Sequence, residues 1–186
     1  MNKYLFLTLG LASLLTACQS MTPQQCSQST PYTWYNQGFN AGASGELPRI
    51  SNKIYQNCQS IGVTPNHDMY QQGYQAGLKH YCTANNALQQ GMKGYHFNVE
   101  RCPADRHIFV QANNKGLQHY DLTQKIEHTA KDIKRLRTDM DNLRHNNGTH
   151  YDNYERERVR LKYWQEIQYL EQRIDDYQRQ AYDLLK

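Results

Sequence analysis

The chain has 186 residues, of which 38% are hydrophobic, so it is long enough for one modest domain with an appendage but has little apolar material for a large core. Its 15 tyrosines outnumber 4 phenylalanines and 2 tryptophans, which favours a thin core whose hydroxyl groups stay near water. The formal net charge of +4 is too small for the concentrated basic face of a nucleic-acid-binding protein, so we expect no nucleic-acid partner.

The N-terminus has the pattern of an export signal. Lys3 precedes an apolar run over residues 4–15, which is too short to span a bilayer as a permanent helix. The run ends in Leu15-Thr16-Ala17-Cys18, which resembles the lipobox of bacterial lipoprotein precursors. The resemblance implies a signal peptide over residues 1–17, diacylglycerol attachment to the Cys18 thiol, and acylation of the new N-terminus, which together give a stable anchor. The alternative is an ordinary secretory peptide with an unrelated cysteine.

The residue after the lipobox bears on the destination. Gln19 stands where an aspartate would suggest retention in the inner membrane of enteric bacteria. By this analogy we expect a lipid anchor in the outer membrane of the bacterial cell envelope, facing the periplasm. Residues 18–30 are rich in Gln, Ser, Thr and Pro, and their polarity predicts a flexible tether between lipid and domain.

Four further cysteines follow, and an oxidising compartment favours disulfides between them. Cys26 precedes the first expected helix and Cys58 lies near the end of the second, while Cys82 ends the third and Cys102 precedes the fifth. Antiparallel packing of these helices favours the pairs Cys26–Cys58 and Cys82–Cys102 among the three pairings that four cysteines allow. The alternative is a metal site with His80 and Cys82 among its ligands, but the spacing lacks a paired Cys-x-x-Cys motif, so we expect no metal.

Five helices are expected between residues 31 and 118. Thr30, Ser51 and Thr83 are suitable N-caps, Pro65-Asn66-His67-Asp68 suits the start of the third helix, and Cys102-Pro103 suits the start of the fifth. Gly45, Gly62 and Gly94 suit helix ends.

Glycines recur inside these helices although each costs about 1 kcal/mol relative to alanine. Gly38 and Gly42 are four residues apart, as are Gly73 and Gly77, so each pair lies on one helical face. The pattern favours close helix-on-helix packing, with the neighbouring tyrosines as core. The alternative is a glycine-floored aromatic groove that binds cell-wall glycan or peptide, with a candidate binding face made of Trp34, Tyr70, Tyr74, Tyr81 and Tyr95.

The order of these residues resembles a known family. Trp34, the spaced glycines, Gly77-Leu78-x-x-Tyr81-Cys82 and Cys102-Pro103 are similar to the bacterial domain-of-unknown-function family 2799, over about residues 26–118. Members look like small exported lipoproteins or periplasmic proteins, so the resemblance implies fold and location without mechanism. Ala41 departs from the family pattern, which usually has Asp before Gly; any role of that Asp is absent here.

Residues 119–186 have a different character, with thirteen Lys/Arg and thirteen Asp/Glu. Apolar residues recur at spacings of three and four on both sides of Asn147-Gly148, which predicts an antiparallel coiled-coil-like hairpin whose first helix runs over residues 118–143. A tip centred on Gly148 sets Ile133 near Tyr163, whereas a seven-residue slip sets Ile133 near Leu170. The alternative architecture is a homo-oligomer in which a second copy closes the seam.

No motif indicates an enzyme. Nucleophile elbows, phosphate-binding loops and His-Glu-x-x-His are absent from the sequence, the histidines are scattered, and no spacing of the four carboxylates in residues 19–118 suggests paired acid and base. We therefore expect an all-α protein without catalytic residues or cofactor. Its parts are a signal peptide (1–17), a lipidated cysteine with tether (18–30), a disulfide-stapled domain (31–118) and a helical hairpin (119–186). The expected function is that of a structural or protein-interaction module that binds another envelope protein.

Overall fold

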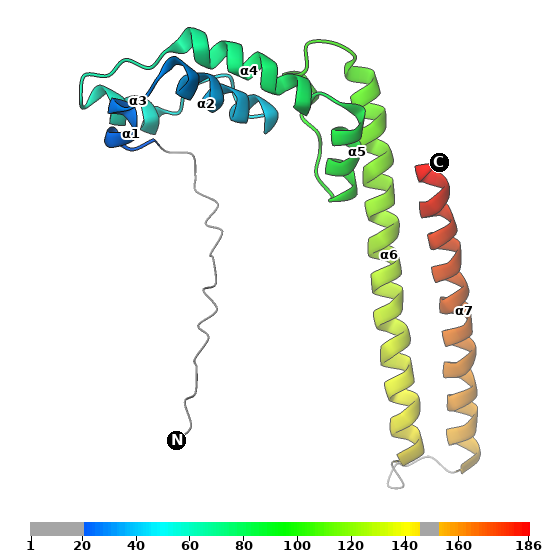
Figure 1. The fold of residues 1–186 in the computed structure, drawn as a ribbon. Helices are drawn as coiled ribbons and strands as arrows, with labels where there is room; N and C mark the ends of the chain where they lie inside the picture. The colour runs from blue at the N-terminus through cyan, green and yellow to red at the C-terminus, as the bar shows by residue number, and fades with distance from the viewer. Residues whose placement is uncertain (1–20, 146–152) are drawn as a thin grey trace, which may run out of the picture.

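The computed structural model of the protein describes residues 21–145 and 153–186. Within these ranges every regular element is a helix, with no strand, which confirms the expected all-α fold (Figure 1). None of the helices in these ranges is long and apolar enough to cross a membrane. The elements are α1 (Pro23–Ser27), α2 (Pro31–Ala43), α3 (Asn52–Gln59), α4 (His67–Tyr81), α5 (Ala84–Met92), the 3₁₀ turn η1 (Val99–Arg101), α6 (Arg106–His145) and α7 (Asn153–Leu185).

Local side chains define where the first helices begin. The hydroxyl oxygens of Thr30, Ser51 and Thr83 each accept a hydrogen bond from the backbone N–H three residues ahead, which confirms these three caps. Asn66 caps α4 in the same way. The fifth expected helix differs from the prediction, because α6 begins at Arg106 and the residues just before Cys102 form η1 instead.

Helices α2 and α4 approach each other through glycine. A Cβ atom added to Gly38 would lie 1.9 Å from the Tyr70 carbonyl oxygen, and one added to Gly73 would lie 1.9 Å from the Tyr35 carbonyl oxygen. Gly42 and Gly77 make equivalent contacts one turn further along. The two backbones are therefore in direct contact at four positions, and the predicted helix-on-helix packing is confirmed.

The same contact recurs between α5 and α6. An added Cβ at Gly91 would lie 2.3 Å from the Asn113 carbonyl oxygen, and one at Gly116 would lie 2.3 Å from the Leu88 carbonyl oxygen. The second helix of each pair carries the pattern Gly-Leu-x-His-Tyr, over residues 77–81 in α4 and residues 116–120 in α6.

The turns that end α2 and α5 are equivalent as well. Gly45 and Gly94 follow their helices with φ of 70° and 82°. The ring of Tyr81 covers Gly45, and the ring of Tyr120 covers Gly94. The pairs α2/α4 and α5/α6 are thus two versions of one helix pair, joined where α4 is followed almost directly by α5 (Figure 1).

Asn113 is a buried polar residue at the centre of the second pair. Its side-chain oxygen accepts from the Phe97 N–H at 3.1 Å, and its amide nitrogen donates to the carbonyls of Ala87 and Tyr95 at 3.0 and 2.9 Å. The residue is 5% exposed. Asn113 occupies the position in the second pair that Tyr74 occupies in the first. The Tyr74 hydroxyl likewise donates to a carbonyl of the segment after the preceding helix, that of Glu46.

Replacing Asn113 by alanine should lower the free energy of unfolding by about 2 kcal/mol, because three buried backbone groups lose their partner. Chemical denaturation of the oxidised protein measures the loss. Asn114→Ala, at the exposed neighbouring position, should change stability by less than about 0.5 kcal/mol. Equal stabilities of the two variants would contradict the assignment of Asn113 to the interior.

The predicted boundary between residues 118 and 119 lies inside α6. This helix is continuous over 40 residues, about 60 Å, so the domain and the hairpin share one element. The interior glycine Gly116 does not interrupt the helix, because it packs against α5.

The tether predicted over residues 18–30 is wrong for the described part of that range. Met21 is 4% exposed, Thr22 and Gln25 form a capping box, and Cys26 is 1% exposed. The segment is ordered because Asn57 of α3 binds it: the Asn57 side-chain amide donates to the Met21 carbonyl at 2.7 Å. Residues 18–20 lie outside the described residues.

Helices α6 and α7 lie side by side and antiparallel (Figure 1). Arg137 Nη2 lies 2.6 Å from Glu171 Oε1, and Ile133 and Ile174 line one groove with this ion pair. These contacts place Ile133 beside Ile174, one helical turn beyond Leu170, so the register is close to the slipped one, and they exclude the register that places Ile133 beside Tyr163. Asn147 and Gly148, the expected tip, lie outside the described residues.

Candidate functional site

Most of the candidate binding face lies in the interior. Trp34, Tyr70, Tyr74 and Tyr81 are 3–7% exposed and belong to one core cluster. The alternative in which they line an open groove is therefore excluded, because the opposing helix and the segment after α2 cover them, and the favoured interpretation of these side chains as core is confirmed. Tyr95 is 62% exposed, but it follows α5 and does not extend a common face with the other four.

The buried tyrosines hold the chain that follows α2 in place. Tyr70 donates to the Arg49 carbonyl at 3.0 Å and Tyr74 donates to the Glu46 carbonyl at 2.8 Å. Tyr81 accepts from the Asn98 N–H at 3.2 Å, and its ring stacks on Phe97 with centroids 4.4 Å apart. Each hydroxyl thus has a partner while its ring is buried, as expected for a tyrosine-rich core.

Burial raises the pKa of Tyr70, Tyr74 and Tyr81 above 10.0, because the interior disfavours the phenolate. The folded state therefore binds these protons more tightly than the unfolded state. It follows that their contribution to stability is complete below pH 10 and is lost as the pH rises through the raised pKa values.

We expect the urea concentration at the midpoint of unfolding to be unaffected by these three groups up to about pH 10. Above that pH it should fall. Tyr81→Phe should reduce the alkaline slope, since one of the three groups is removed. A slope that is the same in Tyr81→Phe and in Tyr95→Phe would contradict the assignment.

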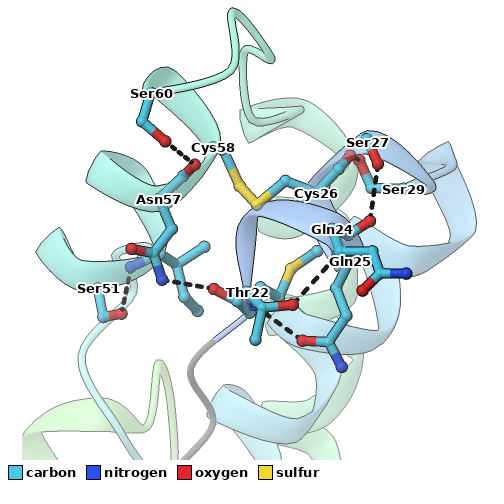
Figure 2. Close-up of a disulfide and its surroundings, with 12 residues drawn as sticks. Thr22, Gln24, Gln25, Cys26, Ser27, Ser29, Ser51, Asn57, Cys58 and Ser60 are labelled. Atoms are coloured by element: carbon cyan, nitrogen blue, oxygen red, sulfur yellow. Dashed lines mark hydrogen bonds between the residues drawn. A yellow bond between two sulfur atoms is a disulfide. The ribbon is translucent and has the colours of Figure 1, made fainter.

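Both predicted disulfides are present. Cys26 is bonded to Cys58, with Cα atoms 5.2 Å apart, and Cys82 is bonded to Cys102, with Cα atoms 5.6 Å apart. Figure 2 shows the first bridge joining α1 to α3 beside the hydrogen bond of Asn57. Since Cys82 is oxidised, it is no thiolate ligand, and within residues 21–145 and 153–186 no group of three His, Cys, Asp or Glu is arranged to hold a metal.

Residues 33–118 match the family model described as protein of unknown function (DUF2799). We call residues 33–118, which are similar to this family, the DUF2799 segment. No curated protein and no solved structure gives a significant match. The resemblance drawn from the glycine, Tyr-Cys and Cys-Pro elements is thus confirmed.

The DUF2799 segment contains both glycine-packed helix pairs and three of the four bridging cysteines. It ends within α6, so the outer part of that helix, all of α7 and the N-terminal α1 lie beyond it. Ala41, the departure from the family pattern, is 3% exposed in α2. The spaced glycines and buried tyrosines of the segment are therefore accounted for by packing.

An exposed apolar surface lies outside the DUF2799 segment, at the start of α7. Tyr154, Leu161 and Trp164, here called the tip stripe, are 72%, 56% and 53% exposed. Tyr154 and Leu161 are seven residues apart and Trp164 is three further on, so they follow one another along the helix on a side turned away from the α6 seam.

The tip stripe was not predicted from the sequence, because the apolar residues at spacings of three and four that form the seam dominate the pattern of α7. The signal was present as three large apolar residues outside the seam positions. Basic side chains accompany it: the Arg158 guanidinium lies 5.9 Å from the centroid of the Tyr154 ring, and Arg160 pairs with Glu157. Residues 153–164 contain four Lys/Arg and two Asp/Glu, so this stretch of α7 carries a net positive charge.

Proposed function

We propose that the protein is a non-enzymatic cell-envelope lipoprotein, anchored to the outer membrane through Cys18, that binds another envelope protein through the tip stripe of its hairpin. The exposure of the tip stripe is the observation that carries the interaction half of the proposal. Single exposed apolar residues are ordinary, but this stripe combines a Tyr and a Trp with Arg beside them, the residue types enriched at interface hot spots, and Leu161 extends the apolar area between the two rings.

The hairpin places this surface at a distance from the rest of the chain. The tip stripe lies at the beginning of α7, at the end of the hairpin opposite to the helix pairs (Figure 1). The net positive charge around it suits a partner that presents an apolar pocket with acidic side chains at its rim. The lipobox supports the anchoring half, since export and acylation place the chain on the membrane face where such a partner resides.

The interaction is tested by photo-crosslinking in intact cells. A photoreactive amino acid at Leu161 should yield one reproducible crosslinked protein, identified by mass spectrometry. Trp164→Ala in the same chain should reduce that adduct about tenfold or more, the loss expected for a hot spot. The control is Tyr182→Ala, which removes a side chain that is 65% exposed on the same helix but far from the tip, and it should leave the adduct unchanged.

Three outcomes overturn the interaction half: no specific adduct, an adduct that is unaffected by Trp164→Ala, or an adduct with a second copy of this chain, which would instead support self-association through residues 119–186. Anchoring is tested separately. Cys18→Ala should abolish metabolic labelling with a palmitate analogue, and persistent labelling would overturn the anchoring half.

A further inference from the structure

The folded part of the chain begins very close to the proposed lipid. Met21 is 4% exposed and its carbonyl oxygen accepts from the Asn57 amide of α3 at 2.7 Å. Five residues later, Cys26 is covalently joined to Cys58, the residue next to Asn57 in the last turn of α3 (Figure 2). The start of the chain is thus held to α3 at two points.

Only Gln19 and Ser20 separate Cys18 from Met21. Whatever their arrangement, three residues span at most about 10 Å from Cα to Cα. A lipid attached to Cys18 is therefore joined to the folded domain by a very short linker. Met21, where the described fold begins beside α1 and α3, must remain within about 10 Å of Cys18, the residue that carries the acyl chains.

The charges at this end suit such a position. Residues 21–45 and 47–67 contain no Asp or Glu, and Glu46 between them follows α2. Lys53 is exposed and lies four residues before Asn57, on the same face of α3 that binds Met21. The exposed side chains of α1 are otherwise neutral, with Gln24 and Gln25 among them. Asp68, in the first turn of α4, is the first carboxylate after α3 in the sequence, so this end carries Lys53 and few carboxylates and is compatible with anionic phospholipid headgroups.

We propose that the α1/α3 end of the protein is a membrane-contact surface that lies against the phospholipid headgroups of the bilayer in which Cys18 is anchored. This inference rests on the anchoring half of the proposed function. It adds an orientation: α1 and the face of α3 that carries Lys53 and Asn57 lie toward the lipid, and the pair α5/α6 and the hairpin lie farther along the chain from it (Figure 1).

Photo-crosslinking to lipid tests this orientation in the full acylated protein, reconstituted into vesicles of phosphatidylethanolamine and phosphatidylglycerol. A photoreactive amino acid at Gln24 or Lys53 should give lipid adducts at least fivefold above those from Gln89 in α5 or Tyr169 in α7. All four positions are exposed, so the comparison is matched for accessibility.

A second variant changes only the length of the linker between Cys18 and Met21. Twenty Gly/Ser residues inserted between Gln19 and Ser20 have a root-mean-square span of about 25 Å, and adducts at Gln24 and Lys53 should fall to the level of the control positions. Acyl label on Cys18 is measured in every sample.

The outcomes separate the two proposals. Absence of acyl label from the unaltered chain overturns the anchoring itself and this inference with it. Acyl label with equal adducts at all four positions, or with none at Gln24 and Lys53, overturns the orientation alone. Adducts that persist undiminished with the inserted spacer also overturn it, because the short linker would then not hold the surface at the membrane.

Discussion

Gly73→Ala should destabilise the protein by about 3 kcal/mol, although alanine is the better helix former by about 1 kcal/mol. The added Cβ would lie 1.9 Å from the Tyr35 carbonyl oxygen and 2.9 Å from the Phe39 nitrogen. Both atoms belong to the backbone of α2, so no side-chain rotation relieves the overlap. The helices must separate, and the tyrosines that pack beside them lose contact.

Whether Gly73→Ala raises or lowers the free energy of unfolding distinguishes close helix packing from intrinsic helix propensity. Were α4 not in contact with α2, Gly73→Ala would raise the free energy of unfolding; in the observed packing it should lower it. Gln72→Ala, at the exposed adjacent position, provides the control and should stay within about 0.5 kcal/mol of the unaltered protein. Urea denaturation monitored by circular dichroism measures both, and a stabilised Gly73→Ala variant would disprove the close contact.

Replacing Cys26 and Cys58 together by alanine should cost about 3.7 kcal/mol, from the chain entropy of closing a loop of this length. The two cysteines are separated by 32 residues and are 0–1% exposed. Since a typical domain is stable by only about 5–15 kcal/mol, this loss is a large fraction of the total.

The loss should also have a local signature. The bridge and the Asn57 hydrogen bond hold α1 on α3. Without the bridge, the amides of residues 22–29 should exchange their hydrogens faster, while those at the α5/α6 contact should keep most of their protection below the unfolding transition. Ser27→Ala, which removes one exposed hydrogen bond to the Gln24 carbonyl, serves as the control. A double variant within about 1 kcal/mol of the unaltered protein would contradict the prediction.

Features set by short-range chemistry were predictable from the sequence. Thr30, Ser51 and Thr83 cap helices through a hydrogen bond to the backbone three residues ahead, so their role is readable from local order. The glycine pairs and both disulfides follow from one further step, the packing of neighbouring helices side by side.

Features that depend on distant partners were not predictable in the same way. The order of α1 depends on Asn57, 36 residues beyond Met21, and polarity alone suggested a tether. The continuity of α6 through Gly116 depends on α5, which makes an interior glycine a contact point. Whether the tyrosines formed a groove or a core was decided by what covers Tyr70 and Tyr74, namely the segment that contains Glu46 and Arg49.

The sharing of α6 between the second helix pair and the hairpin has a mechanical consequence. From Gly116, where α6 crosses α5, to His145 the helix continues for 29 residues without interruption, about 44 Å. This part of the helix can pivot as a rigid rod about the glycine contact. A tilt of about 10° at that contact would sweep the far end through about 8 Å, so small changes in how α5 and α6 pack become large displacements of the tip stripe.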